Sequence, residues 1–211
     1  MPRAIFYKLH PQHPEPHKIA NIAQALEDGA LMLYPSDTVY AVGCDPRNKT
    51  AIERVRAIKP QTSFKLLTLL CPSLADIATY AYVDDAAFKL MRSLTPGPFT
   101  FILKGTKEMP RLVLDPKRKT AGLRVPDHPI CQAILARLGG ILASTSAKLP
   151  DTEEVERLDE LFDLFSHRVD LIVDDGGALR NVPSTVIDLT TPDFEIVREG
   201  LGMEALTPFL K

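Results

Sequence analysis

The chain has 211 residues, of which 45% are hydrophobic and 25% are charged. These proportions are ordinary for a soluble globular protein that can bury a core, and they exclude an intrinsically disordered chain. Lys and Arg number 25 against 27 Asp and Glu, so the net charge is −2, and the overall charge alone does not predict binding to a polyanion. The length fits one large domain, or one domain with a small appendage.

The cysteines and the N-terminus indicate the compartment. Cys44, Cys71 and Cys131 form no C-x-x-C pair and their number is odd, which favours a reduced intracellular protein over a disulfide scaffold. The N-terminus lacks the apolar run of a signal peptide, and the longest apolar stretches, such as 66–71, are too short to span a bilayer. We therefore expect a soluble, cytoplasmic protein that does not act at a membrane.

The first third of the chain predicts a helix followed by two strands that flank a polar loop. Apolar residues recur at helical spacing over 16–28, and Gly29 can adopt the left-handed conformation that ends a helix. The runs 30–34 and 39–44 predict short buried strands. The turn Ser36-Asp37-Thr38 joins them, and a helix over 50–59 and a strand over 66–71 follow.

The rest of the chain continues to alternate helices and strands. We expect helices over 73–81, 85–94, 129–138 and 151–165, the last with a capping box formed by Asp151 and Glu154. We expect strands over 99–104, 120–125, 141–144, 169–173, 185–189 and 194–198. Without a linker or repeat, this order predicts a single α/β domain over 16–211, with a twisted, open, mixed sheet flanked by helices and an N-terminal arm over 1–15.

Charge is segregated along the chain. Residues 104–124 carry seven basic and two acidic residues, whereas 151–175 carry ten acidic and two basic residues. A basic segment beside an acidic helix can produce a one-sided field. For 117–119 taken alone, a solvated surface is the favoured interpretation.

Motifs of the common catalytic classes are missing. The sequence has no P-loop, no complete G-x-G-x-x-G, no H-E-x-x-H and no G-x-S-x-G. Cys44 is interpreted as a small buried residue rather than a nucleophile. Prolines alternate with His10, His13 and His17, which favours an extended arm, so no metal site is expected.

The remaining candidates for a functional site are short polar loops at strand ends. They cover 34–38, 144–148 and 183–185, and ligands of open α/β sheets bind at strand ends. Their hydroxyl groups can bind phosphate or carboxylate oxygens, and the countercharge can come from Lys59, Lys65, Arg124 and Arg198. The residues alone thus predict an anion or nucleotide site, although an ordinary turn explains any single loop about as well.

Six sequence blocks resemble the YrdC/YciO family, most closely its YciO branch, over nearly the whole chain. They are YPSDTVYAVGCDP (34–46), TPGPFTFILKGT (95–106), GLRVPDHP (122–129), STSAKLP (144–150), PSTVIDLT (183–190) and IVREGLG (196–202). The resemblance implies one α/β domain with a large, concave, positively charged surface. Catalytic members of this family join L-threonine, bicarbonate and ATP into threonylcarbamoyl-AMP for tRNA modification and release pyrophosphate. The family has also been associated with binding of double-stranded RNA and tRNA.

The resemblance also implies roles for individual residues. Ser36 and Thr38 would hold the threonine, and the candidate catalytic residues are Lys59, Lys65 and Arg124. The candidate substrate- and nucleotide-binding residues are Ser36, Thr38, Lys59, Lys65, Arg124, Ser144, Ser146, Lys148, Ser184 and Arg198. Mg²⁺ would enter with ATP if the protein is catalytic. Adenylate transfer depends on positioning and charge neutralisation more than on a nucleophilic side chain.

Two residues depart from the pattern of the catalytic branch. Gln61 stands where the K-x-R element has Arg, and Lys148 stands where the S-x-N element has Asn. A hydrogen bond from a charged group is worth about 1.5–3 kcal/mol, and Gln carries no charge. We therefore expect a protein that binds ATP or an AMP-like nucleotide and structured RNA, with weakened or lost synthase activity. The alternative is an active L-threonylcarbamoyladenylate synthase that acts in tRNA modification.

Overall fold

The computed structural model describes residues 3–58, 67–149, 155–191 and 193–210. Within these ranges the strands are β1 (Ile5–Lys8), β2 (Met32–Tyr34), β3 (Ala41–Cys44), β4 (Thr68–Leu70), β5 (Phe99–Lys104), β6 (Thr120–Arg124), β7 (Leu142–Ser146), β8 (Leu171–Asp174), β9 (Thr185–Asp188) and β10 (Glu195–Arg198). The helices are α1 (Pro16–Glu27), α2 (Lys49–Ile58), α3 (Leu74–Tyr80), α4 (Asp85–Leu94), α5 (Pro129–Arg137), α6 (Leu158–Phe165) and the 3₁₀ helix η1 (Met203–Phe209).

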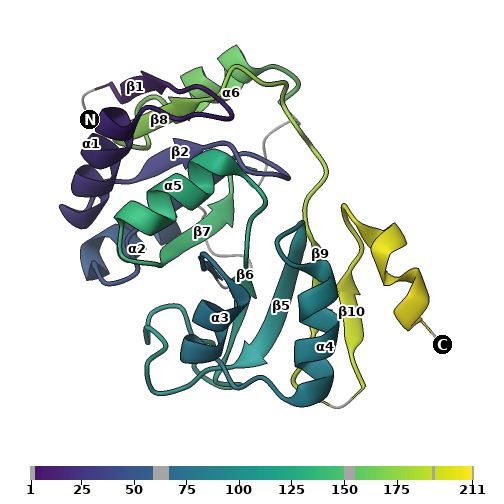
Figure 1. Cartoon of the computed structure of the whole chain (residues 1–211). Coiled ribbons are helices and arrows are strands. Elements are labelled where there is room, and N and C mark those ends of the chain that lie inside the picture. The colour runs from purple at the N-terminus through teal and green to yellow at the C-terminus, as the bar shows by residue number, and fades with distance from the viewer. Residues whose placement is uncertain (1–2, 59–66, 150–154, 192, 211) are drawn as a thin grey trace.

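All the described strands join one mixed sheet, in the order β1-β8-β2-β3-β7-β4-β6-β5-β9-β10. β1, β8 and β2 run parallel to one another, as do the pairs β4–β6 and β5–β9, whereas the other neighbours are antiparallel. Helices flank the sheet, β1 and β10 are its two edges, and the N- and C-termini lie near these opposite edges (Figure 1). The predicted single α/β domain with a mixed sheet is therefore confirmed.

Side chains alternate between two hydrophobic clusters on the two faces of the sheet. In β2, Leu33 belongs to a large cluster with residues of α2, α4 and α6, whereas Met32 and Tyr34 belong to a smaller cluster with residues of α1 and α5. α1 and α5 pack against each other over this second face (Figure 1). Among the described residues, the smaller cluster reaches β7 and β4 at Leu142 and Leu70 but includes no residue of β6, β5 or β9.

The N-terminal segment differs from the expected arm. Ile5–Lys8 pairs with β8, so part of the segment belongs to the sheet. The segment also turns, because Nδ1 of His10 accepts hydrogen bonds from the backbone N–H groups of Gln12 (3.2 Å) and His13 (3.0 Å). The partner strand of β1 begins at Leu171, and no local pattern in the sequence can indicate so distant a pairing.

The acidic helix is shorter than expected, because α6 begins at Leu158 instead of residue 151. Arg157 has extended backbone angles (φ −125°, ψ 146°), and the predicted capping pair Asp151 and Glu154 lies outside the described residues. Asp159 and Glu160 occupy the first turn, where the positive end of the helix dipole favours carboxylates. The other predicted elements within the described ranges begin and end within two residues of their expected bounds, and η1 was not expected.

Candidate functional site

The loop between β2 and β3 is held rigidly by its own hydroxyl groups. Ser36 Oγ donates to the carbonyl of Val39 (2.7 Å) and accepts from the backbone N–H of Thr38 (3.2 Å). The Cys131 thiol of α5 donates to the carbonyl of Pro35 (3.3 Å), which ties the start of the loop to the helix. This bonding fixes the position of the buried side chains that follow Ser36.

Arg124 connects this loop to two other parts of the sheet. It ends β6, and its guanidinium donates to Asp37 Oδ1 (2.7 Å), to Thr38 Oγ1 (2.9 Å) and to the carbonyl of Gly97 (3.3 Å). The side chains of Arg124 and Asp37 are only 9% and 10% exposed, so each charge depends on the other for compensation. Asp37 Oδ2 is also buried and has no hydrogen-bond partner among the described residues, which leaves it available as an acceptor.

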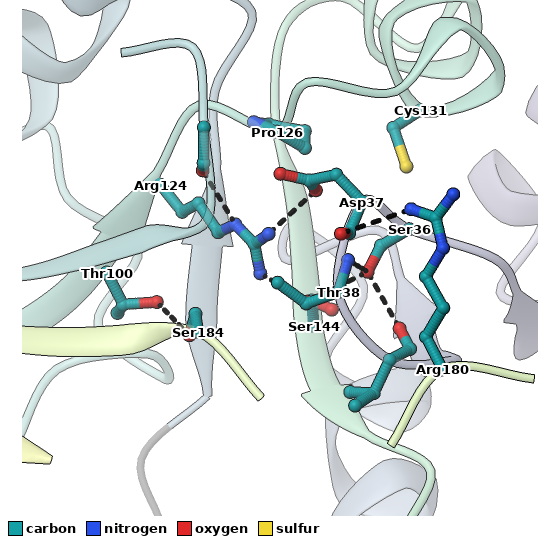
Figure 2. A network of polar contacts seen from close by, with 12 residues as sticks. Ser36, Asp37, Thr38, Thr100, Arg124, Pro126, Cys131, Ser144, Arg180 and Ser184 are labelled. Carbon is teal, nitrogen blue, oxygen red and sulfur yellow. Dashed lines mark hydrogen bonds and ion pairs between the residues drawn. The ribbon is translucent and has the colours of Figure 1, made fainter. Parts of the chain in front are cut away.

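A second basic centre lies at the start of β9. Arg198 of β10 donates to the carbonyl of Ser184 (2.7 and 3.1 Å) and to Ser184 Oγ (3.1 Å), and Ser184 Oγ lies 3.0 Å from Thr100 Oγ1 of β5. Burial and the positive charge of Arg124 lower the pKa of Arg198. Arg124 lies between the 36–38 loop and the Thr100–Ser184 pair, and Arg198 donates to Ser184 of that pair (Figure 2).

Small polar side chains continue across the sheet where the smaller hydrophobic cluster ends. Tyr34 Oη and Ser144 Oγ lie 2.7 Å apart, and Ser144 is the β7 neighbour of Thr68 in β4. A Cβ atom on Gly122 would lie 3.1 Å from Thr100 Cγ2 and 3.4 Å from Thr68 Oγ1, so the glycine allows these threonines to approach β6 closely. We name the set comprising Asp37, Thr38, Thr68, Thr100, Arg124, Ser144, Ser184 and Arg198 the polar cluster.

The structure brings together several of the residues predicted from the sequence. Ser36, Thr38 and Arg124 belong to one hydrogen-bonded group, Ser184 and Arg198 belong to a second, and Ser144 bonds to Tyr34. Ser146 is partly buried at the end of β7, and Lys148 is exposed beyond it. The predicted Lys59 and Lys65, and the divergent Gln61, lie outside the described residues.

Sequence reasoning missed two partners of this network. Asp37 was noted only as a turn residue, although it provides the carboxylate for Arg124. Arg180 was not considered, and it donates to the carbonyl of Asp37 (3.2 Å) from the segment between β8 and β9 (Figure 2). The position of Asp37 between two predicted ligand-binding residues was a signal in the sequence, but Arg180 lies in a stretch without a periodic pattern.

A histidine–carboxylate pair lies at the start of α5. His128 Nε2 and Asp175 Oδ2 are 3.3 Å apart, and both side chains are largely buried. The hydrogen bond from His128 lowers the pKa of Asp175, although burial opposes this. The pair connects the start of α5 to the segment that follows β8, and this segment continues to Arg180.

The cysteines have the buried character that was expected of Cys44. All three thiols are free and buried, and burial raises the pKa of Cys44 and of Cys71 to about 12. Burial also raises the pKa of Cys131. A thiol that stays protonated at neutral pH is a poor nucleophile, so these residues do not indicate thiolate chemistry.

A surface pocket of about 370 Å³ lies beside the polar cluster without sharing its residues. Its walls come from the starts of α3 and α5, the end of α4 and the turn after β6, and they include Ser73, Arg92 and Asp127. Two residues of its wall, Val125 and Pro126, directly follow Arg124 in the sequence.

The basic and acidic segments are not neighbours in the fold. The connection between β5 and β6 carries the exposed Lys107, Arg111 and Lys117, and it joins the ends of these strands that lie away from Arg124. α6 instead lies beside β1, where Phe162 contacts Phe6, and Figure 1 shows the two segments far apart. The basic segment therefore does not lie beside the acidic helix, contrary to the expectation from the sequence.

The described part of the chain contains no group of three or more His, Cys, Asp and Glu side chains that could hold a metal ion. Among the helices of the described ranges, none is long and apolar enough to cross a membrane.

Comparison with known proteins shows which family the chain belongs to. The family model Sua5_yciO_yrdC, described as "Telomere recombination", matches residues 24–200. YciO of Escherichia coli (strain K12) is 44% identical over 97% of this chain and 98% of its own length, and its crystal structure superposes with a TM-score of 0.90 over 98% of this chain and 100% of that chain.

Two more distant relatives have a name or a title that states an activity or a bound ligand. A threonylcarbamoyl-AMP synthase of Vibrio vulnificus (strain YJ016) is 30% identical over 86% of this chain and 98% of its own length. The structure of P. abyssi Sua5 in complex with L-threonine has a TM-score of 0.83 at 24% identity, over 93% of this chain and 58% of that chain, and shows the same fold. With these matches and the mixed sheet described above, the chain belongs to the Sua5/YciO/YrdC family and is related to threonylcarbamoyl-AMP synthase.

Proposed function

We propose that this protein binds ATP or an AMP-like nucleotide at the polar cluster and that its threonylcarbamoyl-AMP synthase activity is weakened or lost. The observation that carries the proposal is the position of Arg124 beside the Thr100–Ser184 pair, to which Arg198 donates, so that two guanidinium groups serve the same part of the sheet. Asp37 neutralises one of them, which leaves an excess of positive charge. A phosphate group between them would relieve their repulsion and could accept hydrogen bonds from both.

The hydroxyl groups of the polar cluster fit the same ligand. Thr38, Thr100, Ser144 and Ser184 can each reorient a hydroxyl hydrogen toward an anionic oxygen without moving the backbone. The unpartnered Oδ2 of Asp37 could accept a hydrogen bond from the ammonium group of an amino acid such as L-threonine. Magnesium enters this proposal as part of the MgATP substrate.

The proposed loss of synthase activity is inferred from two residues of the sequence. The proposal takes Gln61 and Lys148 as replacements for an arginine and an asparagine of the catalytic branch. If the lost guanidinium acted only in the transition state, about 1.5–3 kcal/mol would correspond to a rate decrease of roughly ten- to a hundredfold. Lys148 could return a positive charge, but as a point charge on a flexible side chain.

Two measurements on the purified protein test the proposal. Isothermal titration with MgATP should detect binding, and the Arg198→Met variant should bind at least about tenfold more weakly, since a charged hydrogen bond to phosphate would be lost. Arg168→Met, which removes an exposed arginine after α6, is the matched control and should bind like the parent. Absence of ATP binding would overturn the nucleotide assignment.

Mass spectrometry of a reaction with ATP, bicarbonate, L-threonine and magnesium tests the activity. The synthase of Vibrio vulnificus provides the positive control. Product at a comparable rate would establish the alternative, an active L-threonylcarbamoyladenylate synthase. With little product from the parent, Gln61→Arg combined with Lys148→Asn should increase it, and the absence of any gain would count against these residues as the cause.

A second proposed function is the binding of structured RNA. The observation that favours it is the group of exposed cationic side chains in and beside the β5–β6 connection, namely Lys104, Lys107, Arg111, Lys117, Arg118 and Lys119. The concave basic surface expected from the family resemblance is part of this proposal. Because the connection lies at the far end of β6, roughly 13 Å from Arg124 at 3.3 Å per residue, RNA and nucleotide would bind at separate places.

The salt dependence of RNA binding, compared between variants, tests whether this surface binds the RNA. RNA affinity should fall steeply with salt, and replacing Lys117 and Lys119 with Ala should lower the magnitude of the salt slope by about 1–2 while leaving ATP binding unchanged. The control replaces Lys49 and Lys89 with Ala, which removes the same charge from α2 and α4. Equal effects of both pairs of substitutions would contradict a dedicated RNA surface.

A further inference from the structure

The two edges of the sheet differ in their protection against pairing with another strand. β10 carries charged residues at both ends, Glu195 and Arg198, and its register shifts between Ile196 and Arg198. Charges and bulges of this kind discourage edge-to-edge association. β1 has no register shift and one charged residue, Lys8 at its end, and it exposes the apolar side chains of Ile5 (60%) and Phe6 (52%).

The backbone of β1 presents the polar groups of Phe6 and Lys8 on its outer side. The N–H groups of Ile5 and Leu9 donate to the carbonyls of Asp170 (2.9 Å) and Asp174 (2.8 Å), so alternate residues of β1 face β8 and the residues between them face away. Of the outward groups, the Lys8 carbonyl accepts a hydrogen bond from Lys18 Nζ (2.8 Å). Phe6 at the centre of the strand directs both its N–H and its C=O away from the sheet.

We propose that β1 is a dimerisation edge, at which a second copy of this chain pairs antiparallel about a two-fold axis through Phe6. The axis makes the two Phe6 residues a hydrogen-bonded pair, in which each N–H donates to the carbonyl of the other copy. A donor and an acceptor on one residue are self-complementary under this symmetry. The Ala4 N–H already donates to the Ser166 carbonyl (2.8 Å), so the new ladder is short and centred on Phe6.

Side chains on both copies complement each other in this register. Phe6 already contacts Phe162 of α6, with ring centroids 5.5 Å apart, and the Phe6 ring of the second copy would extend this aromatic group. Lys8 of the second copy would lie opposite Ala4, at the end of β1 where Arg3 contacts Asp163 (3.4 Å). α6 presents Asp159, Glu160 and Asp163 there, so the lysine of each copy approaches the acidic helix of the other.

Sedimentation velocity across a wide micromolar range of protein concentration tests the proposal. The parent should show a reversible monomer–dimer equilibrium. Phe6→Lys should weaken the dimer by about tenfold or more, because it places like charges opposite each other and removes an aromatic pair. Val197→Lys is the matched control, since Val197 lies on the other edge strand and is 53% exposed, and it should leave the equilibrium unchanged.

Charge reversal tests the register. Lys8→Glu should weaken the dimer, and combining it with Asp163→Lys should restore part of the affinity, which a merely structural role of Lys8 would not produce. A protein that stays monomeric at all concentrations would overturn the proposal and leave the edge to an extended peptide of another protein. Equal effects of Phe6→Lys and Val197→Lys would also overturn it.

Discussion

One face of the sheet is used in two different ways on its two halves. Under α1 and α5 it is apolar, with Met32, Leu142 and Leu171 in the smaller hydrophobic cluster. Over β6, β5 and β9 the corresponding positions carry Arg124, Thr100 and Ser184, held by hydrogen bonds. Both halves follow the same two-residue alternation, and the other face of the sheet is apolar under both.

Packing and the proposed ligand binding are therefore assigned to different strands of the sheet. The apolar half needs no specific partners, because burial of apolar surface is non-directional. The polar half depends on specific hydrogen bonds and on the Arg124–Asp37 ion pair, which makes its stability sensitive to single substitutions. Four predictions test this division, from the largest expected effect to the smallest.

Removing the central cation should break the polar half. Arg124→Met should lower the free energy of unfolding by about 3–5 kcal/mol, because Asp37 would remain buried without its partner. Urea denaturation measures this. The double variant Arg124→Met/Asp37→Asn should recover much of the loss, and a double variant as unstable as the single one would show that the buried charge of Asp37 is not the cause.

A cavity in the apolar half should affect stability alone. Ile134 of α5 is fully buried in the smaller cluster, so Ile134→Ala should cost about 2–5 kcal/mol of stability. The affinity of the folded variant for MgATP should equal that of the parent by titration calorimetry below its unfolding range. A large decrease in affinity would mean that the two halves are coupled.

The boundary between the halves lies at the Tyr34–Ser144 hydrogen bond, which should show non-additive behaviour. Tyr34→Phe or Ser144→Ala alone should destabilise by about 1–3 kcal/mol, because each leaves a buried hydroxyl without its partner. The double variant should lose clearly less than the sum of the two, as measured by a double-mutant cycle in urea. Simple additivity would argue that this contact contributes nothing.

The smallest effect concerns acid. The hydrogen bond from His128 holds the pKa of Asp175 below 3.8, so the carboxylate contributes stability that is fully present above pH 3.8 and is lost as the pH falls through the lowered value. Asp175→Asn should therefore flatten the dependence of stability on pH below 3.8. Thermal unfolding of both proteins across this range measures the change, and identical slopes would contradict it.

Much of the fold and part of the site could be predicted from the sequence. Elements such as α4 and β5 have patterns contained within their own residues, and their bounds match the expectation. Arg124 and Ser184 could be proposed because they lie at strand ends, within blocks that resemble a family. The pairing of Arg124 with Asp37 joins residues 87 positions apart, and neither this contact nor the pairing of β1 with β8 has a local signal.

The strand order also has a consequence for how the chain folds during synthesis. The N-terminal strand β1 can pair only after Leu171–Asp174 has been made, and Thr100 meets Ser184 across 84 positions. Arg198 completes the polar cluster near the end of the chain. Such long-range contacts slow folding, because the chain loses loop-closure entropy before the stabilising contacts form. A nascent chain that ends before β9 therefore exposes unpaired strand edges and lacks the Arg198 side chain of the polar cluster.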